Sequence, residues 1–164
     1  MLRKSIIDEG IGTYYDLVKP EEQPPFSGVI AICDYICTKG GKNVIVTHRG
    51  RQGTADLLAA HHMSGYFAGC LTRDDGYPKK PDPAAFEAIL KAHNLEREQT
   101  IAVGDRDIDV LAGQAAGLIT CLFGSETEGA VADLTVSSFD ELYRYLVRPP
   151  DDEEGLGSSL LGSG

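Results

Sequence analysis

The sequence contains no apolar run that approaches the roughly 20 residues needed to cross a bilayer. Its first residues, Met1 to Asp8, include charged side chains and no long apolar segment, so they predict no secretory signal peptide. We therefore expect a protein without membrane association that resides in the cytoplasm.

Basic residues are scarce. The chain has 15 Lys and Arg against 25 Asp and Glu, and four of the acids form the run Asp151 to Glu154. The net charge of −10 argues against nucleic acid and anionic membranes as partners, because both are bound through Lys and Arg patches. A small phosphorylated substrate remains compatible with an acidic chain, since only its site must be locally positive or hold a metal.

Cysteine is present only as Cys33, Cys37, Cys70 and Cys121, with no CxxC pair and no zinc-type spacing. This pattern favours free buried thiols in a reducing compartment over a zinc site or a disulfide framework.

A length of 164 residues corresponds to one domain, and its central part alternates between strand and helix patterns. Gly and Pro interrupt residues 1–25, which we interpret as an irregular segment or the remnant of a cap domain. Residues 26–147 form the predicted core, and residues 148–164 a disordered acidic and Gly/Ser-rich tail. Strands are predicted at residues 43–46, 70–72, 100–103, 119–123 and 134–136, and helices at 29–37, 52–62, 83–93, 107–116 and 139–146.

This alternation predicts an α/β fold, a three-layer, doubly wound parallel sheet. Ligands of such sheets bind at the carboxyl ends of the strands. Three segments with suggestive chemistry fall there or in the loops beyond: Thr47, the pair Lys79-Lys80, and Asp105.

Asp105 follows a buried strand, and Asp109 lies one helical turn later on a similar face. Gathered carboxylates suit Mg²⁺, which prefers oxygen ligands and keeps several waters. Capping of the helix N-terminus is the competing interpretation: we favour it for Asp107 and weigh it evenly against metal binding for Asp105. Taken alone, Thr47 and the Lys-Pro segment are each more typical of ordinary structural positions.

The order of these segments is more informative than any one of them. Strand–Thr47, then Lys80-Pro81-Asp82-Pro83 opening a helix, then strand–Gly104-Asp105-x-x-x-Asp109 resembles motifs II, III and IV of the haloacid dehalogenase-like (HAD) hydrolases, most closely their phosphoglycolate phosphatase-like group. The segments 26–29 and 113–118 also resemble that group, so the match covers about residues 26 to 146.

The resemblance implies a Mg²⁺-dependent phosphohydrolase acting on a small phosphorylated metabolite. Thr47 would bind the transferring phosphoryl group, Lys80 would be the motif III lysine with Lys79 in reserve, and Asp105 would bind Mg²⁺. Asp109 would support the site or hold the metal's water, and His48 and Arg49 would contact substrate.

Motif I, Asp-x-Asp-Gly-Thr, is not recognisable. In such enzymes its first Asp attacks phosphorus and its second acts as acid and base. The nearest candidate is the stretch from Ile6 to Thr13. If Gly12-Thr13 is matched to the motif, Glu9 falls at the nucleophile; if Asp8 is the nucleophile, Gly10 falls at the acid/base. Neither register supplies both carboxylates.

Motif I follows the central strand of the family fold, and omitting that strand would leave costly unpaired backbone groups. Three interpretations remain: residues 4–8 form a short strand in this slot, the sheet closes differently, or a preceding segment is absent. The third is the simplest, so we expect the first strand and most of the cap to be absent or degenerate.

Two classes of function follow: an incomplete or weakly active phosphohydrolase, or a non-catalytic module on the same fold that binds a phosphorylated ligand or a protein. A phosphoacceptor signalling domain is a third possibility, against which the Lys80-Pro81-Asp82-Pro83 segment argues. We expect a monomer or a weak homodimer.

Overall fold

A parallel sheet forms the centre of the molecule. The computed structural model describes residues 4–7, 19–125 and 127–148. Within these ranges the strands pair in the order β3-β2-β1-β4-β5-β6, and every pair is parallel. The strands are β1 (Lys4–Ile7), β2 (Lys42–Val46), β3 (Phe67–Leu71), β4 (Thr100–Gly104), β5 (Ile119–Phe123) and β6 (Leu134–Val136). The helices are α2 (Val29–Thr38), α3 (Arg51–Ala60), α4 (Ala84–Ala92), α5 (Asp107–Ala115) and α6 (Phe139–Leu146), with short 3₁₀ turns η1 (Pro20–Glu22), η2 (Ser64–Tyr66), η3 (Arg73–Asp75) and η4 (Arg97–Gln99).

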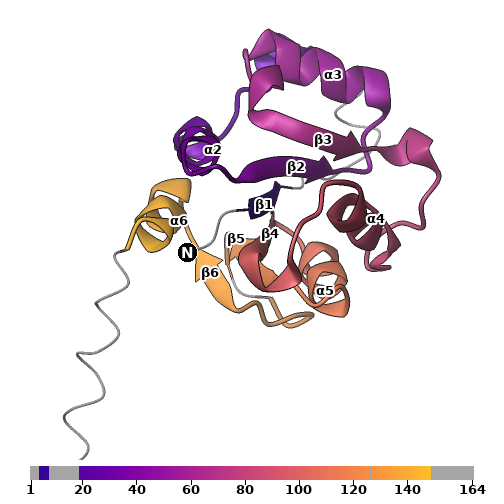
Figure 1. Cartoon of the computed structure of the whole chain (residues 1–164), viewed down its shortest axis with the longest axis vertical. Helices are drawn as coiled ribbons and strands as arrows, with labels where there is room; N and C mark the ends of the chain where they lie inside the picture. The colour runs from indigo at the N-terminus through magenta and orange to yellow at the C-terminus, as the bar shows by residue number, and fades with distance from the viewer. Residues whose placement is uncertain (1–3, 8–18, 126, 149–164) are drawn as a thin grey trace, which may run out of the picture.

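The helices lie on both faces of the sheet and make the three layers that the sequence predicts (Figure 1). Side chains of β2 alternate between the two faces, as in any strand. Ile45 faces the layer of α2, α3 and α6, where it lines a hollow with Leu57 of α3. Val44 and Val46 pack with α4 and α5 around Phe86 and Ala112. The predicted α/β doubly wound fold is therefore confirmed.

The strand β1 occupies the central slot of the sheet, which corrects the interpretation we preferred from sequence. Its residues pair with β2 on one side and with β4 on the other, so that Ile7 lies opposite both Ile45 and Val103. Of the three interpretations, the short strand at residues 4–8 is thus the one observed, with the described strand ending at Ile7. A strand of four residues can hold this place because each of its residues pairs with both neighbouring strands.

The core boundary that we placed at Phe26 consequently leaves out a strand of the sheet. The rest of residues 1–25 is described from Lys19 onward, where η1 and the following residues lead into α2. The predicted motif I candidates from Asp8 to Thr13 lie outside the described residues, as does the predicted tail beyond Arg148. In the described ranges no helix is long and apolar enough to cross a membrane.

Most elements begin and end within two residues of the predicted bounds, and the exceptions have local causes. The strand predicted at residues 70–72 begins earlier, at Phe67, and Thr72 instead caps η3 by accepting a hydrogen bond from the Asp74 amide. At α4, Pro83 rather than Asp82 is the capping residue, although the Asp82 carboxylate still accepts a hydrogen bond from Ala84 N–H at 2.9 Å. Such one-residue shifts are the usual uncertainty of helix ends.

Candidate active site

The carboxyl ends of β2 and β4 carry Thr47 and Asp105. Because both strands flank β1 and run parallel to it, these ends lie at the same edge of the sheet. The loop between β3 and α4 brings Lys80 to this edge, where it lines a hollow together with Thr47 and His48. The structure thus gathers the predicted segments at one place, as expected for a doubly wound sheet.

Lys80 is buried and paired. Its ammonium Nζ lies 2.8 Å from Asp109 Oδ1, and the side chains of the two residues are 1% and 3% exposed. The same Nζ lies 3.5 Å from the carbonyl oxygen of Val46, the last residue of β2. Burial, which disfavours the charged form, lowers the pKa of Lys80 to about 8 despite the attraction of Asp109. Lys80 therefore connects the end of β2 to the first turn of α5.

Asp109 has two roles. Besides its ion pair with Lys80, its Oδ2 accepts the backbone N–H of Arg106 at 3.1 Å, which caps the N-terminus of α5. The capping predicted for Asp107 thus falls to Asp109, and the Asp107 carboxylate instead accepts a hydrogen bond from the Thr127 hydroxyl. The close approach requires glycine at 104, since a Cβ built there would lie 2.3 Å from the Cβ of Asp109.

Asp105 is the more open carboxylate, with a side chain that is 46% exposed. Partial burial, followed by the negative charge of Asp109, raises its pKa above the usual range. The guanidinium of Arg106 partly offsets these effects: its Nε lies 4.0 Å from Asp105 Oδ1, and its Nη2 lies 3.6 Å from Asp109 Oδ1. Sequence reasoning missed Arg106; its signal is its position between the two carboxylates in the chain.

Of these two carboxylates, Asp105 is the one that suits direct binding of a Mg²⁺ ion. Mg²⁺ is commonly held by one or two carboxylates plus waters and substrate phosphate. Asp105 is accessible, and its pKa is raised by partial burial and then by the negative charge of Asp109, a repulsion that a divalent cation would relieve. The charge of Asp109 is already neutralised by Lys80, so Asp109 is better suited to holding the metal's water than to binding the ion directly. Among the described residues, no group of three or more His, Cys, Asp or Glu side chains could hold a metal by itself.

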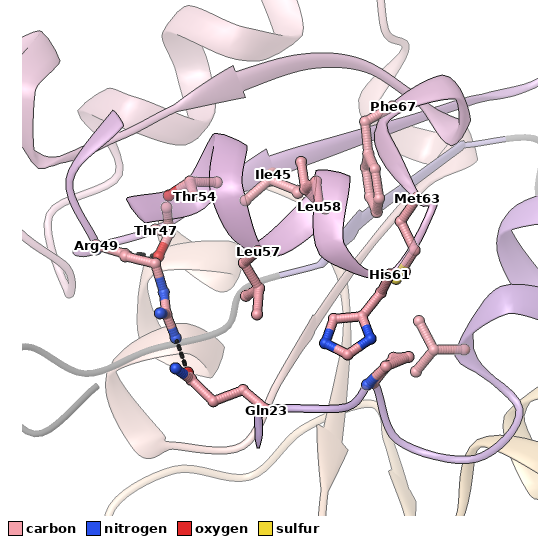
Figure 2. A pocket seen from close by; sticks show the side chains of 12 residues that line it. Gln23, Ile45, Thr47, Arg49, Thr54, Leu57, Leu58, His61, Met63 and Phe67 are labelled. Atoms are coloured by element: carbon pink, nitrogen blue, oxygen red, sulfur yellow. Dashed lines mark hydrogen bonds between the residues drawn. The ribbon is translucent and has the colours of Figure 1, made fainter. Parts of the chain in front are cut away.

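Arg49 lies on a different side of this edge from Lys80, and Thr47 borders the hollows on both sides. The Thr47 hydroxyl accepts the backbone N–H of Arg49 at 3.1 Å, and the Arg49 guanidinium donates to Gln23 Oε1 at 3.0 Å. Figure 2 shows the Arg49 side chain extending from the turn after β2 toward Gln23. There it lines a mainly apolar hollow beneath α3, bounded also by Pro25, Val29, Ile45, Thr54, Leu57, Leu58, His61, Met63 and Phe67. The predicted contact of Arg49 with substrate remains a prediction.

His48 contacts the loop that carries Lys80. Its Nε2 accepts the backbone N–H of Lys80 at 3.2 Å. Burial, and then the positive charges of Arg106 and Lys79, lowers the pKa of His48 below its usual value. The predicted contact of His48 with substrate also stays a prediction, because one of its ring nitrogens is already engaged inside the protein.

Comparisons with known proteins agree with the family resemblance that the sequence motifs indicate. A sequence profile of haloacid dehalogenase-like hydrolases matches residues 2–123. The chain is 30% identical over 105 residues to the pyrophosphatase PpaX of Halalkalibacterium halodurans, covering 64% of this chain and 49% of that protein. It is 36% identical over 73 residues to a phosphoglycolate phosphatase of Vibrio cholerae, covering 44% and 32% respectively.

The match spans less than half the length of these two relatives. A solved structure, the core domain of a putative phosphoglycolate phosphatase from Streptococcus pneumoniae, superposes with a TM-score of 0.66 at 22% identity and covers 87% of this chain and 93% of that one. That similarity shows a shared fold. Because the family profile covers well over half of the sequence, the chain belongs to the haloacid dehalogenase-like hydrolase family.

Proposed function

We propose that this chain is the core of a Mg²⁺-dependent phosphohydrolase that acts, with weak activity, on a small phosphorylated metabolite of the phosphoglycolate type. The observation that carries the proposal is the buried pair of Lys80 and Asp109, which joins the loop after β3 to the first turn of α5. Lys and Asp are almost never fully buried unless they are paired. Such a pair at the carboxyl edge of the sheet is better explained by chemistry than by stability.

The proposed roles follow from position. Thr47 would donate its hydroxyl to a phosphoryl oxygen, and Lys80 would stabilise negative charge that develops during transfer. Asp105 would hold Mg²⁺ directly, and Asp109 would support the site or hold the metal's water. When bound, the ion would neutralise phosphoryl oxygens and orient the ester. Lys80 and Arg106 balance the carboxylates of Asp105 and Asp109, so these four side chains carry no net negative charge although the net charge of the chain is −10, which supports binding of a phosphate there.

For the nucleophile we propose Asp8, which directly follows the last residue of β1, Ile7, in the sequence. An oxygen of this carboxylate would attack phosphorus as the bond to the leaving oxygen breaks, and water would then hydrolyse the aspartyl-phosphate. In this register residue 10 is glycine, so the leaving oxygen would take its proton from water. General acid–base catalysis contributes about 10²–10⁴-fold, and we expect activity to be reduced by a factor of that order.

The test is release of inorganic phosphate from phosphoglycolate and from pyrophosphate, with Mg²⁺ and with EDTA. We expect slow, Mg²⁺-dependent release that Asp8→Asn and Lys80→Met abolish and that Asp105→Asn weakens by lowering the affinity for Mg²⁺. Glu98→Gln, an exposed change within η4, is the matched control. Release that is equal in EDTA, or equal in Asp8→Asn, would refute the catalytic proposal.

A second candidate is a non-catalytic module that binds a phosphorylated ligand, favoured by the glycine at position 10. Calorimetry separates the two. Mg²⁺-dependent binding of inorganic phosphate without turnover of either ester supports the binding module, whereas turnover supports the hydrolase.

A further inference from the structure

The contact between His48 and the backbone of Lys80 links the turn after β2 to the loop after β3. His48 follows Thr47 directly, and Lys80 lies 32 residues later in the chain. The donor in this bond is a backbone amide, which can only donate. The ring nitrogen Nε2 must therefore be the acceptor and carry no proton, so a neutral His48 carries its proton on Nδ1.

The environment of His48 favours this neutral form. The ring is partly buried, and the charges that act on it most strongly are the cations Arg106, from the start of α5, and Lys79, from the loop itself. The carboxylate of Asp109 acts in the opposite direction and more weakly. A protonated ring would present a donor to a donor, which removes the hydrogen bond.

The consequence for Lys80 follows from the geometry of its two ends. Its amide is held by His48 at 3.2 Å, and its ammonium is held by Asp109 at 2.8 Å. Fixing the amide limits where the Cα can lie and therefore where the ammonium can reach. Placement matters at such a site, because a shift of about 1 Å in a reacting group can cost about 10²-fold in rate.

We propose that His48 is a positioning residue, which acts as an Nδ1–H tautomer and holds the Lys80 loop by accepting its backbone amide, rather than a residue that contacts substrate. Its effect on catalysis rests on the proposed function of the site, but the tautomer and the hydrogen bond do not. The hydrogen bond can therefore be tested in the full chain whether or not the chain hydrolyses phosphate esters.

The first experiment is nuclear magnetic resonance of the ¹⁵N-labelled chain. We expect the imidazole spectrum of His48 to show a protonated Nδ1 and an unprotonated Nε2, together with a scalar coupling between Nε2 and the Lys80 amide nitrogen. An Nε2–H tautomer, or a resolved Lys80 amide without this coupling, would overturn the proposal. Failure of the proposed phosphohydrolase activity would leave both expected signals in place.

The second experiment compares His48→Gln with His48→Leu. The carboxamide of glutamine reaches about as far as Nε2 and can accept the Lys80 amide, whereas leucine has no acceptor. With phosphoglycolate as substrate, we expect His48→Leu to lower kcat by about tenfold to a hundredfold with little change in KM. His48→Gln should recover much of the loss. If both variants raise KM and leave kcat unchanged, His48 contacts substrate and the positioning role is wrong.

Discussion

Replacing Lys80 with methionine is the sharpest test of the electrostatics of this site, because two physical arguments predict opposite signs. Removing one partner of a buried ion pair usually costs about 3–5 kcal/mol, since the other charge is left buried without compensation. A lysine whose pKa is lowered on folding, however, carries its charge at a cost to the folded state. In that case its removal stabilises the protein.

The lowered pKa gives the size of the second effect. The pKa of Lys80 falls from an ordinary value of 10.5 to about 8. At about 1.4 kcal/mol per pKa unit, the ammonium costs the folded state about 3 kcal/mol at neutral pH, with the attraction of Asp109 already included. Methionine removes this cost. It also forfeits a hydrogen bond to the carboxylate worth about 1.5–3 kcal/mol.

We therefore expect Lys80→Met to stabilise the chain at pH 7 by about 1 kcal/mol, the remainder of these two effects. The lowered pKa favours the second argument, because the ammonium, 1% exposed, loses nearly all of its hydration and the attraction of Asp109 does not fully offset that loss. Urea denaturation measures the difference through the midpoint and slope of unfolding. Lys91→Met, an exposed change on α4, should stay within about 0.5 kcal/mol of the wild type.

The pH dependence provides an independent check of the sign. Between pH 8 and 10.5 the unfolded chain still binds the proton of Lys80 while the folded chain has released it, so the stability of the wild type rises with pH. Lys80→Met has no such titration, so the difference in the free energy of unfolding between the two proteins should shift in favour of the wild type by about 3 kcal/mol across this range. Other alkaline titrations, such as those of Cys70 and Cys121, occur in both proteins and cancel in the difference. A variant that is 3–5 kcal/mol less stable than the wild type at pH 7, with a gap independent of pH, would refute this reasoning.

Two further substitutions test the frame around the site. Gly104→Ala should cost about 1–3 kcal/mol of stability through overpacking against Asp109 and should also reduce phosphate release. Gly65→Ala, where a Cβ meets nothing within 4 Å, should do neither. Equal unfolding midpoints for the two variants would contradict this expectation, because they would show that Asp109 is free to move away. The buried Asn43 side-chain amide donates to the carbonyls of Cys33 at 3.0 Å and Tyr66 at 3.1 Å. Asn43→Leu removes both hydrogen bonds and should lower the free energy of unfolding, measured by urea denaturation, by at least about 1–3 kcal/mol. A loss below about 0.5 kcal/mol, the scatter of neutral surface changes, would contradict that expectation.

Much of the fold could be predicted from sequence, because its elements have strong local signals. The strand β4 is a continuous, buried and mainly apolar run, and α5 begins at Asp107, two residues after Asp105, and ends before Gly117. A parallel sheet then brings the carboxyl ends of its strands together, whatever the details of packing. For this reason the gathering of Thr47, Lys80 and Asp105 at one edge could be predicted without coordinates.

The direction in which each side chain points could not be predicted in the same way. In the sequence, His48 and Arg49 are simply adjacent polar residues after a strand. In the fold, His48 contacts the Lys80 loop, while Arg49 extends beneath α3 to Gln23. Their partners lie 32 and 26 residues away, and no local pattern encodes such contacts. Likewise, the pairing of Asp109 with Lys80 depends on how the loop after β3 packs on α5.

The strand β1 shows that the absence of a recognisable motif I does not imply the absence of the central strand. Without a recognisable motif I, the sequence favours a missing central strand. The sheet instead needs only a backbone of four residues between β2 and β4, and a segment with two apolar residues, Ile6 and Ile7, supplies it. Backbone pairing sets few requirements on side chains, whereas the chemistry requires two carboxylates at fixed spacing. The described residues therefore keep the six-stranded sheet, and in the register proposed for Asp8 the glycine at position 10 supplies no acid and base. In that register the departure from the family pattern concerns the chemistry at this edge and leaves the strand order of the described sheet unchanged.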